Sequence, residues 1–286
     1  MSKLALKGGT PLRTRPFTSW PIYEDKELQA LERVLKSGKW GTLGSEVEKF
    51  TKRFANYQDC KYGVSVTNGT RSLEIALRAL DIGYGDEVIV PPYTFIATVS
   101  SVIMVGATPV FVDLEKDSYN IDADKIEEAI TPNTKAVTIV HIGGRPCNMD
   151  RIMEIANKHN IHVIEDSAHA HGSEWKGRKV GSFGSAGSFS FQGSKNLCAG
   201  EGGCITTNDE VVYEQCWTIH HCGRSFRGTK WYEHPMVGTN ARMTEWQAAI
   251  LNVQMDRLDE QISRRMENAK YLDARLKETG FIGVFP

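Results

Sequence analysis

One stretch of the chain decides its organisation: Gly187-Ser188-Phe189-Ser190-Phe191-Gln192-Gly193-Ser194-Lys195-Asn196-Leu197. Its first half has the pattern of a β-strand, and the strand runs into a turn that holds one lysine, Lys195. A lysine in apolar surroundings is costly unless it is paired, neutral or covalently bonded. The ordinary alternative is an exposed lysine whose stem lies along a hairpin surface, and most lysines in proteins are of that kind.

Working outward from this stretch, short β-branched apolar runs alternate with amphipathic helical patterns. The predicted strands are 63–66, 87–90, 109–112, 135–140 and 161–164, and the predicted helices are 25–37, 44–57, 95–105, 122–130, 149–159 and 210–219, with one more after Arg71. Residues 185–207 are predicted as strand, turn and strand, and 220–240 as a surface loop. A long helix is expected to begin after Thr244 and to continue past Arg264. This rhythm predicts an α/β fold with a mostly parallel sheet, in which ligands bind at the carboxyl ends of the strands.

Composition excludes several functional classes. The chain has 286 residues, 41% of them hydrophobic and 24% charged, which is typical of a globular protein. Its formal net charge of -1 gives no basic face for nucleic acid. No apolar run is long enough for a membrane span or a signal peptide, so a cytoplasmic location is expected. The six cysteines show neither a CxxC pair nor zinc spacing, so reduced thiols and no metal site are expected.

The segment Thr67-Asn68-Gly69-Thr70-Arg71 lies where a strand gives way to a helix. Free backbone N–H groups and the helix dipole make such a place attractive to phosphate, and Gly69 would let the backbone approach an anion. For this stretch alone a plain helix cap is the more frequent explanation. The motif is neither a Walker loop nor GxGxxG.

A second polar segment, Glu165-Asp166-Ser167-Ala168-His169-Ala170-His171-Gly172, follows a buried strand. An acid at that point, Asp166, could hold a cationic ring nitrogen, and His169 could stack on a flat cofactor or relay a proton. An ordinary capping aspartate beside a satisfied histidine is the alternative. A metal site at His169 and His171 is disfavoured because no further ligands complete a recognised spacing.

The three features together point to one cofactor. Pyridoxal 5′-phosphate (PLP) needs a lysine that forms a Schiff base, an acid for its pyridine nitrogen and a helix N-terminus for its phosphate. Lys195, Asp166 and the turn at Gly69 supply these three parts on one α/β scaffold.

These residues resemble the DegT/DnrJ/EryC1/StrS family of PLP-dependent sugar aminotransferases, which have fold type I. The matching motifs are Thr67-Asn68-Gly69-Thr70, Pro91-Pro92-Tyr93-Thr94-Phe95, the segment 165–172, the segment 188–195, Gly200-Glu201-Gly202-Gly203 and Gly238-Thr239-Asn240-Ala241-Arg242-Met243. The scyllo-inosose aminotransferase and 3-amino-5-hydroxybenzoate synthase subgroups are the most similar. The resemblance implies a mostly parallel mixed sheet with helices on both faces, in three layers.

The resemblance also implies roles for individual residues. Lys195 matches the Schiff-base lysine, Asp166 the acid on the pyridine nitrogen, and His169 the residue stacked on the ring, with Phe95 flanking the cofactor. Phosphate contacts are implied for Gly69, Thr70 and Arg71 through their backbone N–H groups, and for Ser190. Asn240 matches an asparagine that reaches the neighbouring subunit's phosphate, which implies a homodimer. Gln192 is expected to face the substrate.

The implied reaction moves an amino group from glutamate or glutamine to a nucleotide-linked keto-sugar or a keto-cyclitol. It needs a neutral Lys195 near pH 7, so the pKa of this lysine is expected to be lowered. A dehydrating and aromatising enzyme like 3-amino-5-hydroxybenzoate synthase is the first alternative. The dehydratase branch, which carries histidine at the lysine position, is disfavoured. A non-catalytic PLP-binding protein is disfavoured by the intact set of site residues.

Two domains are expected, a PLP-binding major domain with an N-terminal arm over residues 1–260 and the start of a C-terminal small domain over 261–286. Members of the family are longer and end in a complete small domain. The small domain is therefore expected to be largely absent, and a truncated PLP-binding homologue with little activity is a further alternative.

Overall fold

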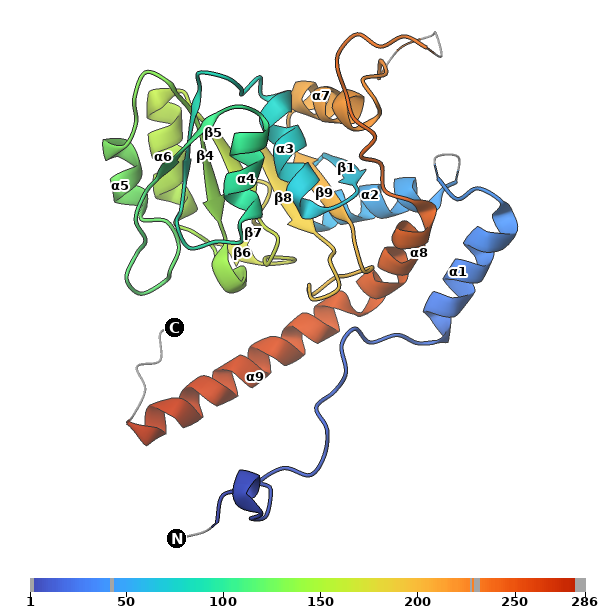
Figure 1. Cartoon of the computed structure of the whole chain (residues 1–286), viewed down its shortest axis with the longest axis vertical. Helices are drawn as coiled ribbons and strands as arrows, with labels where there is room; N and C mark the ends of the chain where they lie inside the picture. The colour runs from blue at the N-terminus through green and yellow to red at the C-terminus, as the bar shows by residue number, and fades with distance from the viewer. Residues whose placement is uncertain (1–2, 42–43, 227, 229–231, 281–286) are drawn as a thin grey trace.

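The computed structural model describes residues 3–41, 44–226, 228 and 232–280. Within them, seven strands form the main sheet, in the order β1-β9-β8-β5-β4-β2-β3 (Figure 1). In that order the strands are β1 (Tyr62–Val66), β9 (Gly203–Thr207), β8 (Ala186–Ser190), β5 (His162–Asp166), β4 (Thr134–Val140), β2 (Glu87–Val90) and β3 (Thr108–Phe111). β9 is antiparallel to both β1 and β8, and the other neighbours are parallel. The predicted mostly parallel mixed sheet is confirmed.

Helices cover both faces of the sheet, which gives three layers (Figure 1). α3, α4 and α7 pack on one face, and α2, α5, α6 and α8 on the other. The helices are α1 (Asp25–Ser37), α2 (Glu46–Tyr57), α3 (Gly69–Ala79), α4 (Ala97–Met104), α5 (Ala123–Glu128), α6 (Met149–His159), α7 (Glu210–His220), α8 (Glu245–Gln254) and α9 (Leu258–Thr279), with short 3-10 turns η1 (Ala5–Lys7), η2 (Ile142–Gly144) and η3 (Met255–Arg257). Most predicted elements are present, with ends shifted by a few residues at most.

Side-chain caps explain where several helices begin. The Asn68 side chain accepts a hydrogen bond from the backbone N–H of Arg71 at the start of α3, and Asp122 and Asp209 cap α5 and α7 in the same way. Thr244 and Gln247 form a reciprocal capping box at the start of α8. The caps of α3 and α7 fix the entry points of two helices that follow strands β1 and β9.

The long helix predicted after Thr244 is wrong in one respect, because η3 divides it into α8 and α9. Two side chains at this division bond to the N-terminal segment: the Gln254 amide and the Arg257 guanidinium both donate to the Ile22 carbonyl and to Glu27. The tightened turn thus accompanies the anchoring of the arm. α9 then runs through residues 260 and 261, and the division into two domains there stays a prediction.

A hairpin absent from the sequence prediction joins β6 (Glu174–Trp175) to β7 (Arg178–Lys179). Its turn is Lys176-Gly177, and both residues have left-handed backbone angles, φ 50° and 82°. Two such residues fit the tight turn that suits the right-handed twist of a two-stranded ribbon. Each strand has only two residues, which is too short for an alternating pattern to be visible in the sequence.

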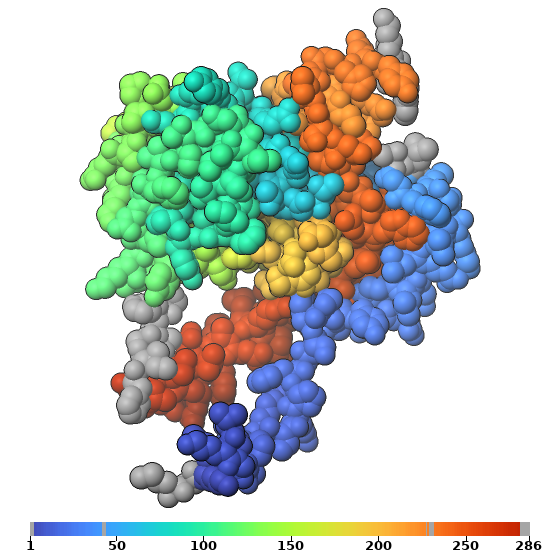
Figure 2. Space-filling model, viewed as in Figure 1, coloured from blue at the N-terminus to red at the C-terminus, as the bar shows by residue number. Residues whose placement is uncertain are grey.

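The N-terminal arm and α9 extend together from the edge of the body where the turn after β8 lies (Figures 1 and 2). They touch near the body, where the Arg265 guanidinium lies 4.5 Å from the centre of the Trp20 ring. No helix in the described part of the chain is long and apolar enough to cross a membrane. Those same residues hold no group of three side chains suited to bind a metal ion.

Candidate active site

Several segments lie together at the carboxyl end of the parallel strands. They are the ends of β4 and β5, the turn after β8, and the N-termini of α3 and α4. Asp166 is the last residue of β5 and pairs in register with Ser188 on β8, so both side chains lie on the face that α3 and α4 cover. Lys195 lies in the turn that continues from β8. The parallel arrangement of β4, β5 and β8 therefore brings these segments together, as the sequence predicts.

Asp166 is held by hydrogen bonds to both of its carboxylate oxygens. It is 6% exposed, the Thr98 hydroxyl on α4 donates to Oδ2 at 2.7 Å, and the Ala168 backbone N–H donates to Oδ1 at 3.2 Å. Since the one hydroxyl proton of Thr98 goes to Asp166, the neighbouring Thr94 hydroxyl, 2.7 Å away, donates to Thr98. A relay of two hydroxyl groups thus holds the Asp166 carboxylate in place.

Lys195 is half-buried, and burial lowers the pKa of its ammonium group, while the nearby Asp166 carboxylate opposes that shift. The pKa of His169 is lowered first by burial and then by Lys195, and Asp166 opposes that shift too. These mutual effects place the three groups within electrostatic reach of one another. The direction of the Lys195 shift is the one that a proton-transferring amine requires.

The start of α3 approaches β8 closely. A Cβ atom added at Gly69 would lie 2.8 Å from the Cβ of Ser190, a separation too short for a side chain. The backbone N–H groups of Gly69 and Thr70 make no hydrogen bond among the described residues, whereas that of Arg71 already donates to Asn68 Oδ1 at 2.9 Å. The free donors at this helix N-terminus therefore belong to Gly69 and Thr70, and Ser190 lies beside them.

Comparison with known proteins decides the family. The model of the DegT/DnrJ/EryC1/StrS aminotransferase family matches residues 21–285. The chain belongs to this family. The predicted family, fold class and aminotransferase activity are confirmed.

Three relatives show the range of this aminotransferase family. The L-glutamine:2-deoxy-scyllo-inosose aminotransferase of Streptomyces kanamyceticus is 41% identical over an alignment that covers 98% of this chain and 69% of the relative. The crystal structure of a 3-amino-5-hydroxybenzoic acid synthase has a TM-score of 0.87 at 39% identity, covering 91% of this chain and 68% of the other. A protein of Streptococcus pneumoniae assigned as a sugar aminotransferase, solved in its PLP form, has a TM-score of 0.84 at 32% identity, covering 92% of this chain and 71% of the other.

Three further predicted site residues of this aminotransferase, Phe95, Gln192 and Asn240, are exposed. Phe95 is 69% exposed just before α4. Gln192 is exposed, and its side-chain oxygen accepts hydrogen bonds from the backbone N–H and the hydroxyl of Ser194. Asn240 is exposed on the loop after α7, where its backbone pairs with His221.

Thr98 was not singled out in the sequence, and His171 was considered there only as a metal ligand. Thr98 falls four residues after Thr94, a spacing that places both hydroxyls on one side of a helical turn, and this was the signal available. The buried His171 bonds through Nε2 to the Ser190 carbonyl oxygen at 3.0 Å, and burial lowers its pKa to about 3. His171 is therefore neutral and supports the strand that carries Ser190.

A separate cavity of about 500 Å³ lies beside β1, an edge strand of the main sheet. Residues of α2, β1, α7 and α8 line it, among them Thr51, Lys52, Tyr62, Trp217 and Glu245. Neither Lys195 nor Asp166 belongs to its lining, so this cavity is separate from the site described above.

Proposed function

We propose that this aminotransferase uses PLP to move an amino group from glutamine or glutamate to a keto-cyclitol or a nucleotide-linked keto-sugar. One observation carries the proposal: the buried, doubly hydrogen-bonded Asp166 lies within electrostatic reach of a lysine whose pKa burial lowers. Glutamine is named in the S. kanamyceticus relative, and a sugar aminotransferase and a PLP form are named in the S. pneumoniae structure.

The residues present fit PLP at both of its ends. The close approach of Gly69 to Ser190 leaves a backbone cradle with two free N–H groups and a hydroxyl beside it, which suits a phosphate. Asp166 offers an anion for a protonated pyridine nitrogen. When bound, PLP supplies an electrophilic carbon and a ring that accepts electrons from the bond being broken.

The protein's own residues then position and move protons. Asp166, held by the Thr98 hydroxyl, is the residue that would hold the pyridine nitrogen of bound PLP. With PLP bound, the amine of Lys195, whose pKa burial lowers, would take up the proton that leaves the α-carbon of the amino donor. His169 is proposed to stack on the ring, Phe95 to flank it, and Gln192 to face the substrate. The phosphate contacts are assigned to Gly69, Thr70 and Ser190, with Arg71 acting through the cap that it shares with Asn68.

The test uses the absorption spectrum of the purified chain titrated with PLP. We expect a visible band from PLP linked to Lys195, and loss of that band when glutamine or glutamate is added. Lys195→Ala should remove both the band and the transamination, because no other amine takes its place. An unchanged spectrum and rate in Lys195→Ala would contradict the assignment.

The product separates the proposed reaction from its alternative. An aliphatic amino-cyclitol or amino-sugar supports transamination, whereas a UV-absorbing aromatic amine supports a reaction like that of 3-amino-5-hydroxybenzoic acid synthase. A PLP band that no donor bleaches would support a PLP-binding chain with little activity.

We also propose a homodimer in which Asn240 contacts the phosphate bound by the neighbouring subunit. Its exposed position on the loop after α7 supports this assignment. Mixing inactive Lys195→Ala with inactive Asn240→Ala gives a mixed dimer with one intact site, so about a quarter of the wild-type rate should return after random exchange of subunits. If Asn240 served its own subunit, the mixture would stay inactive.

A further inference from the structure

Glu165, the residue before Asp166, is a charged group that the proposed reaction does not use. It is completely buried, at 0% exposure. Because side chains alternate along a strand, Glu165 points to the face of β5 opposite that of Asp166. A carboxylate in such a place needs specific partners.

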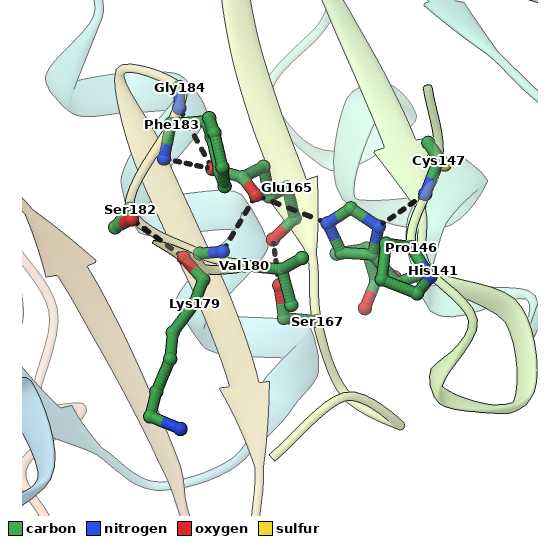
Figure 3. A network of polar contacts seen from close by, with 12 residues as sticks. His141, Pro146, Cys147, Glu165, Ser167, Lys179, Val180, Ser182, Phe183 and Gly184 are labelled. Atoms are coloured by element: carbon green, nitrogen blue, oxygen red, sulfur yellow. Dashed lines mark hydrogen bonds and ion pairs between the residues drawn. The ribbon is translucent and has the colours of Figure 1, made fainter. Parts of the chain in front are cut away.

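Four donors surround the carboxylate of Glu165 (Figure 3). The backbone N–H groups of Phe183 and Gly184 donate to Oε1 at 2.7 and 2.8 Å, and that of Gly181 donates to Oε2 at 2.6 Å. The imidazole Nε2 of His141 lies 3.1 Å from Oε2. The other ring nitrogen of His141 accepts from the Cys147 backbone N–H at 3.1 Å, so the ring proton is on Nε2 and faces Glu165. Both oxygens of the Glu165 carboxylate therefore act as hydrogen-bond acceptors.

These contacts tie three neighbouring strands together. His141 follows β4, Glu165 belongs to β5, and residues 181–184 lead into β8. This lead-in segment crosses directly over β8, since a Cβ atom added at Gly187 would lie 2.5 Å from the Gly181 carbonyl oxygen. Glu165 and Gly187 are paired in register, which puts the carboxylate at the crossing point. One buried anion therefore fixes how β8 lies against β5.

The same residues also hold the backbone of Asp166. The backbone N–H of His141 donates to the Asp166 carbonyl oxygen at 3.1 Å, and the next residue, Ser167, donates to the Ser188 carbonyl oxygen on β8 at 2.8 Å. His141 thus binds Glu165 with its side chain and Asp166 with its main chain. A displacement of Glu165 would therefore also displace Asp166, through its contacts with β4 and β8 on either side of β5.

We propose that Glu165, together with His141, is a positioning residue that sets the separation between Asp166 and the strand leading to Lys195. The role rests on the proposed function, because it concerns the relative placement of the acid and the lysine in that reaction. Misplacement of a reacting group by about 1 Å can cost roughly a hundredfold in rate.

Glu165→Gln tests this role, with Thr206→Val as the matched control. The NH2 group of glutamine would face either the N–H groups of Gly181 and His141 or those of Phe183 and Gly184, which breaks part of the cluster. Thr206 on β9 donates to the Gly181 carbonyl oxygen at 2.7 Å, so Thr206→Val loosens the same lead-in segment without touching β5. Both variants are expected to lower the melting temperature.

The two variants should separate in two measurements. In the cofactor-free protein, hydrogen exchange at the His141 and Ser167 amides should become about tenfold faster in Glu165→Gln only. In the PLP-loaded protein, the single-turnover reaction with glutamine should slow by about 10- to 100-fold in Glu165→Gln, with the half-saturating glutamine concentration little changed. Thr206→Val should keep both values near those of the wild type.

Equal effects of Glu165→Gln and Thr206→Val on rate and exchange would overturn the proposal, because they would show a general loss of stability. If Glu165→Gln does not fold, His141→Leu replaces it, and His141→Gln, which can both donate and accept, should restore the rate. The exchange measurement needs no cofactor. A wild-type chain that bound no PLP would therefore refute the proposed function and leave this test standing.

Discussion

Removing the Thr98 hydroxyl should destabilise the cofactor-free protein measurably. Thr98→Val keeps the shape of the side chain and deletes the donor that lies 2.7 Å from Asp166 Oδ2. Thr98 is 0% exposed and Asp166 6% exposed, so water does not replace the lost bond. A hydrogen bond to a charged group contributes about 1.5–3 kcal/mol, and the free energy of unfolding should fall by that amount. The melting temperature should then fall by roughly 3–12 °C.

Two companion variants test whether the hydroxyl is the cause. Thr98→Ser keeps the hydroxyl and loses one methyl group, and should cost about 1 kcal/mol. Thr94→Val removes only the outer member of the relay, a neutral hydrogen bond that contributes about 0.5–1.5 kcal/mol. Urea unfolding of the three cofactor-free variants measures each loss. If Thr98→Val were within about 0.5 kcal/mol of the wild type, or less destabilised than Thr98→Ser, the role assigned to the hydroxyl would be wrong.

Three further predictions concern the residues around this acid. Gly69→Ala should weaken PLP binding about tenfold or more in a titration, because its Cβ would lie 2.8 Å from that of Ser190. Adding Ser190→Gly to this variant should relieve the clash, but it removes the Ser190 hydroxyl as a phosphate contact. Burial lowers the pKa of Lys195 in the folded state, so the unfolded state binds its proton more tightly. Lys195→Met should therefore stabilise the cofactor-free protein at pH 7–8, and a pH series of melting temperatures should show the gain vanishing above the ordinary pKa of 10.5. Burial lowers the pKa of His171 to about 3 in the folded state. The unfolded state therefore binds a proton that the folded state does not, and the free energy of unfolding falls as the pH drops from 6.5 to 3. In His171→Gln this fall should be less steep.

The sequence predicted the scaffold of this chain better than its hydrogen-bond networks. Strand and helix periodicity, and acids or asparagines at helix starts, are local signals, and they located elements such as β2 and α6 at their observed bounds. The edge at which Asp166 and Lys195 meet followed from the parallel topology. The hairpin β6–β7 was missed because each strand is two residues long.

The partners of the site residues could not be read in the same way. Thr98 reaches Asp166, and Glu165 reaches Gly181 and His141, through contacts between segments far apart in the sequence. A threonine in a helix and a glutamate in a strand are common, and apart from the spacing of Thr94 and Thr98 nothing local marks them as buried and paired. For Arg71 the family resemblance implied a phosphate contact through the backbone N–H, while the structure shows that this N–H donates to the Asn68 side chain.

The pairing of β1 with β9 has a consequence for how the chain folds during synthesis. β1 is made early and lies at one end of the sheet, whereas its partner β9 comes after β8. Until the ribosome has released the segment around Gly203, β1 has no strand to pair with and the entropy of closing this long loop is not yet repaid. The start of α3, which directly follows β1, can be fixed in place only once β1 has paired with β9. A ligand that binds at the start of α3 and at the turn with Lys195 would associate only with chains that have completed this pairing, and its concentration would raise the folded fraction of newly made protein.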